Sequence, residues 1–254
     1  MEALIGFLIA VTIGLTGVGG GVITAPVLIL FLGLPAPVAV GTALLYVTIV
    51  KTAAAPLYLL RKQVDFKILV LLLAGGIPGV VAGSILLKRV HASHLSGLVL
   101  TLVGLTVLVS AAVNLLQLAS RREAAPAGDR RRLLPVLSAG IGIEVGFSSA
   151  GAGALGTVML MNLTRLAPAE VVGTDLLYGF GLSAVGGGFQ FLTGSYNPAL
   201  LMKLSIGGVA GALVGAQLAG IFPRRVARAA LSLWLAGMGV QLCWKGLGSL
   251  LQRL

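Results

Sequence analysis

The stretch Gly41-Thr-Ala-Leu-Leu-Tyr46 returns 132 residues later as Gly173-Thr-Asp-Leu-Leu-Tyr178. Extending this match in both directions aligns residues 14–88 with residues 146–220 without a gap, and 19 of the 75 aligned pairs are identical. The composition alone would give roughly 7 identities. A duplication of this kind indicates a fold built from two copies of one unit, with functional residues where the two copies meet.

The composition places both copies in a membrane. Hydrophobic residues make up 57% of the chain and charged residues only 10%, whereas a soluble domain carries about 25% charged residues. Apolar runs fall at about 3–32, 38–60, 66–87, 95–118, 133–162, 169–192, 198–221 and 226–251. Most are near the ~20 residues that a helix needs to cross a bilayer, and backbone groups cannot stay unpaired in lipid. The sequence therefore predicts an all-α polytopic membrane protein, with a first transmembrane repeat (1–119), a basic linker (120–132) and a second transmembrane repeat (133–254).

The first apolar run of each half is long for one crossing and short for two. Each has a glycine-rich middle, at residues 14–21 and 146–156, which favours a broken or re-entrant first segment followed by three spanning helices. The two repeats would then be inverted, with 12 lysines and arginines on one side of the membrane and 5 on the other. The alternative, eight plain transmembrane helices as parallel 4+4 repeats, divides the same residues 11 to 6. The positive-inside rule thus favours inverted repeats.

Three ionisable residues stand inside apolar runs, namely Lys51, Glu144 and Asp175. A charge in the bilayer core costs at least ~2.5 kcal/mol, so each of them needs a partner, water or a change of protonation. One interpretation gives Lys51 to an anionic substrate and proton coupling to Asp175 and Glu144. The other is an internal salt bridge that only ties the halves together. None of the three is duplicated in the other half, which predicts an asymmetric site on a symmetric scaffold.

The glycine-rich middles are the second candidate for anion binding. Small residues expose backbone N–H groups, and a helix that starts there points its positive end at the site. Close helix packing is the competing explanation, and it is the one we expect for the spaced glycines at 75–83 and 207–215. Two further features complete the predicted lining of the site. One is the pair of Thr and Tyr side chains that recurs one helical turn apart in both halves, and the other is a buried amide. The substrate-binding residues predicted in this way are Thr16, Gly19, Gly20, Gly21, Thr42, Tyr46, Lys51, Ser148, Ser149, Gly151, Thr174, Tyr178 and Gln190.

Several classes of function are disfavoured. The single cysteine, Cys243, excludes an internal disulfide and a multi-cysteine metal site. No catalytic motif is complete, so we expect neither an enzyme, nor a cofactor, nor a metal. The net charge of +11 is assigned to loops at the cytoplasmic face of a multi-pass inner membrane protein and not to nucleic-acid binding. The expected partners are the lipid bilayer, a small anion and protons as coupling ion, and the sequence leaves the oligomeric state open.

The same residues resemble the sulfite exporter TauE/SafE family of membrane permeases. The similarity is carried by Gly17-Val-Gly-Gly-Gly21 with Pro26, Ala39-Val-Gly-Thr42, Arg61-Lys-Gln-Val-Asp65-Phe, the glycines at 75, 76, 79 and 83, Val172-Gly-Thr-Asp-Leu176 and Gly186-Gly-Gly188. It covers nearly the whole chain outside residues 120–132. In the second copy, Ser149-Ala-Gly-Ala-Gly153 replaces the first glycine segment and Val158 stands in the place of Pro26.

The resemblance implies transport of a small sulfur-containing anion, such as sulfite, sulfoacetate or a related organosulfonate. Together with the duplication it predicts a secondary transporter that works by alternating access. The alternative is an anion or small-solute channel with the same half-helices.

Overall fold

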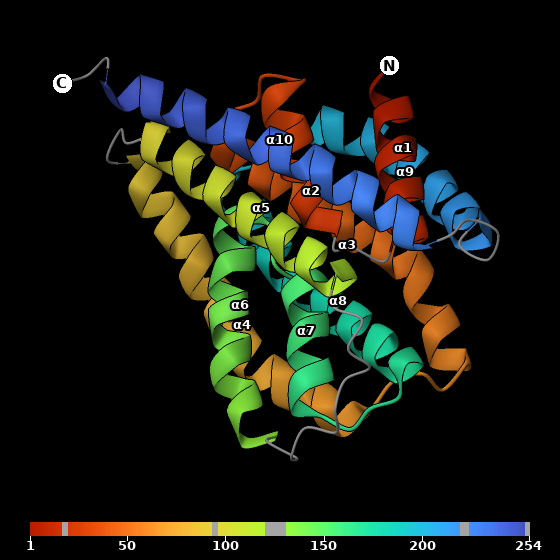
Figure 1. Cartoon of the computed structure of the whole chain (residues 1–254). Helices are drawn as coiled ribbons and strands as arrows, with labels where there is room; N and C mark the ends of the chain where they lie inside the picture. Colours follow the sequence, from red (N-terminus) through yellow and green to blue (C-terminus); the bar gives the residue numbers. More distant parts are fainter. Residues whose placement is uncertain (17–19, 93–95, 120–130, 219–223, 252–254) are drawn as a thin grey trace.

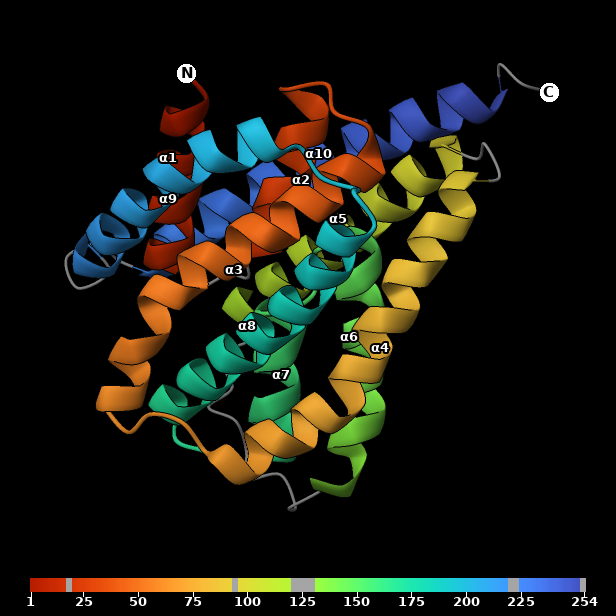
Figure 2. The same cartoon turned by 180° about the vertical axis from the view of Figure 1, so that it is seen from behind.

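The computed structural model describes residues 1–16, 20–92, 96–119, 131–218 and 224–251, and these residues are almost entirely helical (Figures 1 and 2). The helices are α1 (Glu2–Thr16), α2 (Gly20–Leu30), α3 (Ala36–Leu60), α4 (Phe66–Ala92), α5 (Ser96–Ala119), α6 (Leu134–Ser148), α7 (Ala154–Leu163), α8 (Pro168–Leu192), α9 (Pro198–Leu218) and α10 (Arg224–Leu251). A 3₁₀ turn, Arg131–Leu133, precedes α6. Most of the predicted linker, residues 120–130, lies outside the described residues.

Several helices are long and apolar enough to cross a membrane, as an all-α polytopic protein requires. Among the described residues these are 36–60, 66–90, 97–119, 198–215 and 226–249, in α3, α4, α5, α9 and α10. Helix α8 is as long as α3, with 25 residues, but it is less apolar and is not among them. Large apolar side chains such as Phe31, Val136 and Trp244 are exposed on the outside, as expected where lipid covers the surface.

The first apolar run of each half is divided into two short helices. In the first half α1 ends at Thr16 and α2 begins at Gly20. In the second half α6 ends at Ser148 and α7 begins at Ala154. These helices have 10 to 15 residues, too few to cross a ~30 Å hydrocarbon core alone. In Figure 1, α1 begins at the top of the view and α6 at the bottom.

Residues that are 132 positions apart make matching hydrogen bonds between distant parts of the chain. The Tyr46 hydroxyl of α3 donates to the Gly6 carbonyl of α1, and the Tyr178 hydroxyl of α8 donates to the Ser138 carbonyl of α6. Both tyrosine side chains are fully buried, and a buried hydroxyl without a partner would be costly. Each bond therefore fixes one half-helix to the long helix of its own half.

A second matched pair of bonds joins the two halves. The Thr42 Oγ1 accepts a hydrogen bond from the Asn197 N–H at 3.0 Å, and the Thr174 Oγ1 accepts one from the Asp65 N–H at 3.0 Å. Thr42 is near the start of α3, and Asn197 follows the end of α8. Conversely, Thr174 is near the start of α8, and Asp65 follows the end of α3. Helices α3 and α8, which occupy equivalent positions in the two halves, therefore pack antiparallel.

Glycines allow the helices of different halves to approach closely. A methyl group added at Gly75, Gly79 or Gly83 of α4 would overlap a backbone carbonyl of α6. The equivalent glycines of α9, at positions 207, 211 and 215, meet the backbone of α1 in the same way. Backbones in direct contact leave no room for a side chain. The glycine stripes of α4 and α9 thus have a packing role, as the spacing predicts.

A stability measurement tests this packing role. Gly79→Ala should lower the free energy of unfolding by about 1–3 kcal/mol, because the new methyl group must push α4 away from the Ala139 carbonyl. Gly140→Ala is the matched control, since no atom lies within 4 Å of its added methyl group. Thermal unfolding in detergent should separate the two variants, and equal melting temperatures would contradict the packing role of Gly79.

Candidate functional site

The start of α2 meets the second glycine-rich break inside the protein. Gly21, in the first turn of α2, is buried and lies directly against Ser149, which follows α6. A side chain at Gly21 would overlap both the carbonyl and the hydroxyl of Ser149. Gly20 packs against Ile13 of α1 and Val47 of α3. The structure therefore brings together the two segments that the sequence selected independently.

Ser149 places an unpaired hydroxyl at this junction. It adopts the left-handed conformation, with φ of 63°, and its N–H caps α6 by donating to the Val145 carbonyl at 2.8 Å. The residue is only 5% exposed, and its Oγ has no hydrogen-bond partner among the described residues. By contrast, the neighbouring Ser148 hydroxyl is engaged locally, since it donates to the Glu144 carbonyl and accepts from the Ala150 N–H.

Lys51 reaches the same region from α3. Its side chain is buried, with 7% exposure, and it lies one helical turn beyond Val47, which contacts Gly20. The ammonium group sits against Gly179 of α8, where an added methyl group would overlap the Lys51 Nζ and also contact Ala152. The absence of a side chain at Gly179 thus makes room for a positive charge beside the second break.

Asp175 of α8 supplies the opposite charge. Its Oδ2 accepts a hydrogen bond from the Thr157 hydroxyl of α7 at 2.9 Å, and a methyl group at Gly156 would overlap its Oδ1. The carboxylate is 4% exposed, and Oδ1 has no partner within the described part of the chain. Asp175 and Lys51 attract each other electrostatically, yet no nitrogen–oxygen distance of 4.0 Å or less joins these two described residues. The direct salt bridge of the alternative interpretation is therefore not formed in this state.

Glu144 lies at the second break but apart from this pair. Its carboxylate packs against Gly151, where φ is +92° and a side chain would press on Glu144. The Oε1 is buried and has no partner among the described residues. Gly151 thus leaves space for Glu144, which makes the break asymmetric with respect to the first half. A role of Glu144 in proton coupling stays a prediction.

The matched Thr and Tyr residues are held in bonds between helices. Thr42 and Thr174 cap the turns opposite them, while Tyr46 and Tyr178 bond to backbone carbonyls. These contacts give all four a structural reason to recur in both halves. Their contribution to substrate binding stays a prediction.

Gln190 is buried near the far end of α8, away from the Lys51 region. Its Cβ packs against Gly41, and its Nε2 has no partner among the described residues. Gly19 lies outside the described residues, as does the side chain of Thr16. The predicted site residues therefore divide into three sets: those around the two helix breaks, the four Thr and Tyr residues held in bonds between helices, and Gln190.

Four central residues escaped prediction as site residues, namely Ala152, Gly156, Thr157 and Gly179. Thr157 bonds to Asp175, while the other three border the charged groups. A usable signal existed for Thr157, because its partner in the repeat is Ala25. The same signal marks Asp175, whose repeat mate is Ala43, whereas Lys51 and Glu144 pair with the uncharged polar residues Ser183 and Thr12.

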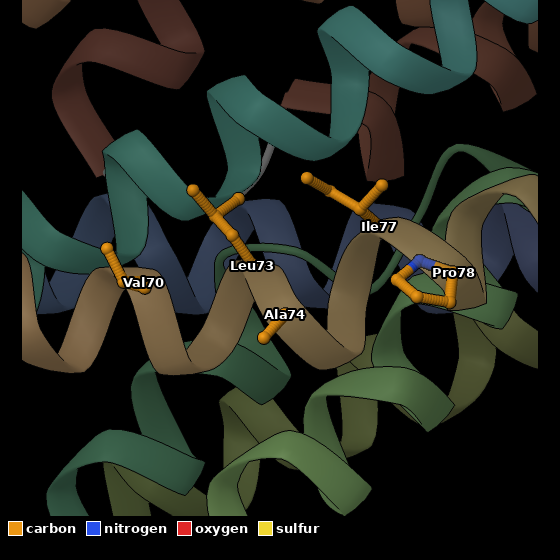
Figure 3. Close-up of a pocket in the computed structure, with 5 residues that line it drawn as sticks. All are labelled: Val70, Leu73, Ala74, Ile77 and Pro78. Carbon is orange, nitrogen blue, oxygen red and sulfur yellow. The ribbon is translucent and has the colours of Figure 1, made fainter.

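An outer groove on α4 has a different character. Figure 3 shows its lining residues Val70, Leu73, Ala74, Ile77 and Pro78, with Leu73 and Ile77 directed toward the side of α8. Leu73 packs against Gly181 of α8. All five side chains are apolar and several are exposed, so this groove faces lipid and offers no group that would bind an anion.

Comparison with known proteins agrees with a membrane role. The chain matches the sulfite exporter TauE/SafE family over residues 2–242. Similar proteins of Bacillus subtilis (strain 168) include the probable membrane transporter protein YjnA, which is 30% identical over 87% of this chain and 91% of its own length. The probable membrane transporter protein YdhB is 28% identical over 94% of this chain and 98% of its own length. No solved structure matches the chain.

An all-helical fold with several membrane-spanning helices, relatives of this kind and buried charges beside broken helices define a multi-pass membrane transport protein. The chain belongs to the sulfite exporter TauE/SafE family.

Anion binding by the purified protein tests the central position of Lys51. Lys51→Ala should weaken binding by about 30-fold or more, since it removes a buried charge from its partner. Calorimetry in detergent with sulfite, sulfoacetate, thiosulfate and sulfate measures this change. Unaltered affinity in a variant that elutes as one symmetric peak would remove Lys51 from the site.

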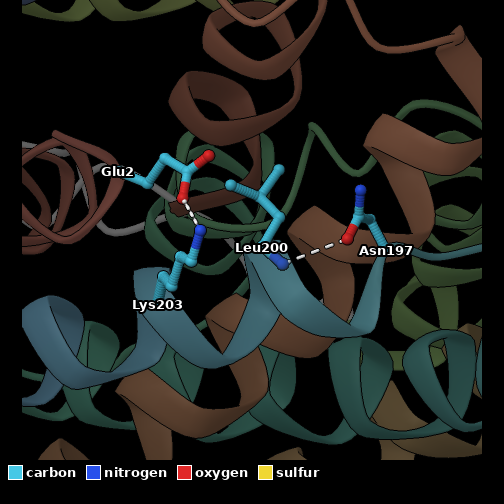
Figure 4. Close-up of polar contacts among 4 residues, drawn as sticks. All are labelled: Glu2, Asn197, Leu200 and Lys203. Atoms are coloured by element: carbon cyan, nitrogen blue, oxygen red, sulfur yellow. Dashed lines mark hydrogen bonds and ion pairs between the residues drawn. The ribbon is translucent and has the colours of Figure 1, made fainter.

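Lys203→Ala is the matched control for the loss of one positive charge. Figure 4 shows Lys203 of α9 paired with Glu2 of α1 at 2.7 Å, on the surface and far along the chain from the breaks. The Lys203 side chain is 57% exposed, and an exposed pair contributes only ~0–1 kcal/mol to stability. Lys203→Ala should therefore bind the anions as the wild type does.

Proposed function

We propose that this protein is a secondary transporter that moves a small sulfur-containing anion, such as sulfite, sulfoacetate or a related organosulfonate, across the inner membrane by alternating access. The observations that carry the proposal are the direct contact of Gly21 with Ser149 and the burial of the Lys51 ammonium group beside Gly179, which also borders Ala152 of the second break. The family name supplies the sulfur anion. The geometry supplies a reason why an anion would bind.

The junction of the breaks offers three kinds of group that favour negative charge. The first N–H groups of α2 have no partner within the helix, and the positive end of the helix dipole lies there. The Ser149 hydroxyl has no hydrogen-bond partner among the described residues, and Lys51 is a buried cation. An oxyanion has several acceptor oxygens and can bind all three at once.

Asp175 gives the site a means of coupling to protons. A carboxylate in this apolar interior competes with the substrate anion for the field of Lys51. Protonation of Asp175 would leave Lys51 to the substrate, and loss of the proton would favour release. Binding of one anion and one proton would then be linked, which makes the transport proton-coupled.

The arrangement of the helices supports inverted repeats within this proposal. Helices α3 and α8 are equivalent in sequence and pack antiparallel, and α1 and α6 start at opposite ends of the structure (Figure 1). Two units related in this way have opposite orientations in the membrane. Exchange of their conformations would open the central site to one side and then to the other.

Counterflow in proteoliposomes tests transport directly. Vesicles loaded with unlabelled sulfite or sulfoacetate should accumulate the labelled anion in a saturable manner, because a carrier exchanges bound substrates. A channel would give flux that is neither saturable at low concentration nor stimulated by the opposite gradient. That result would favour the alternative function.

Asp175→Asn tests proton coupling in the same vesicles. The amide cannot take up a proton, so an imposed pH gradient should no longer drive accumulation, while exchange of anions should continue. Radiolabel uptake with and without the gradient measures the difference. Persistent pH-driven accumulation would remove Asp175 from the coupling mechanism.

Cysteine accessibility tests the inverted arrangement. Single cysteines at Pro35, Ser195 and Ala227, in a background without Cys243, should react with an impermeant thiol reagent from defined sides. Pro35 and Ser195 should lie on one side and Ala227 on the other. Eight plain crossings would instead place Pro35 on the side of Ala227.

A further inference from the structure

The starts of α2 and α7 occupy related places in the repeat but carry different charges. The offset of 132 residues pairs Gly21 with Gly153 and Thr24 with Gly156. It also pairs Ala43 of α3 with Asp175 of α8. Gly21 lies inside α2 whereas Gly153 precedes α7, so the two helix starts differ by two residues in the repeat. Of the paired residues Ala43 and Asp175, only Asp175 is acidic.

At α7 that acidic side chain occupies the first turn. The Asp175 carboxylate accepts the Thr157 hydroxyl and lies where a Gly156 side chain would be. Gly153, the residue before the helix, has φ of 107°. A negative group at this position stabilises the helix start, because the unpaired N–H groups and the helix dipole attract it.

At α2 the residue in the place of Asp175 is Ala43, which carries no charge. Ala43 and Thr24 are both fully buried, and the Thr24 hydroxyl is turned back onto the Gly20 carbonyl at 2.7 Å. The groups that lie against Gly21 are the carbonyl and the hydroxyl of Ser149. Ser149 is only 5% exposed, and its hydroxyl has no partner among the described residues. Val47 ties Gly20 to the α3 turn that precedes Lys51.

We infer that Asp175 is a built-in counterpart of the substrate: its carboxylate fills the first turn of α7, and the anionic group of the substrate binds at the first turn of α2, to the Gly20–Gly21 backbone, Ser149 and Lys51. This inference rests on the proposed anion transport. The inference adds to that proposal by assigning the substrate to one of two related half-helices. It also explains why the charges of the two halves differ, since a second resident carboxylate would exclude the substrate.

Moving the resident carboxylate into the first half tests the assignment. The double variant Thr24→Gly/Ala43→Asp reproduces at α2 the Gly156/Asp175 pair of α7, so the new carboxylate has the space that Thr24 now fills. It should weaken binding of sulfite and sulfoacetate by about 30-fold or more, because two like charges would share one helix end. The isosteric control Thr24→Gly/Ala43→Asn carries the same change in shape without the charge and should bind within about threefold of wild type.

Removal of the unpaired hydroxyl provides an independent variant if the transplanted carboxylate prevents folding. Ser149→Gly keeps the left-handed backbone conformation and should weaken anion binding by about tenfold, as expected for a hydrogen bond to a charged group. Ser205→Ala removes a different buried, unpartnered hydroxyl on α9 and should bind as the wild type does.

Calorimetry with each anion distinguishes the two levels of the proposal. Wild-type protein that binds neither anion would contradict the proposed function. Wild-type binding that survives in Thr24→Gly/Ala43→Asp, or in Ser149→Gly, would overturn the assignment to α2 and leave anion transport standing. Loss of binding in the Asp variant, with retention in the Asn variant, supports the assignment.

Discussion

A helix that ends inside an apolar medium leaves backbone N–H or carbonyl groups without partners, and the architecture of this protein depends on how two such breaks are satisfied. The breaks are placed against each other, with Gly21 of α2 in direct contact with Ser149 after α6. Ser148 and Ser149 pair some of the exposed groups locally. The Asp175 carboxylate bonds in the first turn of α7. In the first turn of α2, Gly21 lies against the carbonyl and the hydroxyl of Ser149, and the proposed anion site is located there.

The scaffold repeats while the charges do not. Matched bonds of Tyr46 and Tyr178, and of Thr42 and Thr174, hold equivalent helices in equivalent ways. Such symmetry gives two related packings of similar free energy, a useful property for a carrier that must expose one site to two sides. Lys51 and Asp175 are confined to opposite halves, so a change in the packing of α3 against α8 alters their interaction. In the proposed transport cycle, the symmetric bonds would hold the two packings, and the asymmetric charges would couple their exchange to the anion and the proton.

The sequence predicted much of the fold because duplication and hydrophobic length are strong signals. It placed the broken first run of each half and the all-helical class, and the glycines at 75, 79 and 83 have the packing role expected of them. It selected Lys51, Asp175, Gly21 and Ser149, since charge and glycine are conspicuous in apolar runs. It did not select Gly156, Thr157 or Gly179, because a small residue that makes room for a distant charge has no local signature. The spacing also could not show that four residues form bonds between helices, namely Thr42, Tyr46, Thr174 and Tyr178. Side chains that share one helix face can either pack against another helix or bind a substrate, and spacing does not distinguish the two.

The central claim is that a substrate anion binds where the first turn of α2 meets Ser149 and Lys51. The most direct measurement is an experimental structure of the protein with selenite, whose selenium atom can be located by anomalous scattering. The account predicts a single strong selenium peak within hydrogen-bonding reach of the Gly21 backbone, the Ser149 hydroxyl and the Lys51 ammonium. A peak in the first turn of α7, or in the outer groove of α4, at a selenite concentration that saturates binding in solution would contradict it.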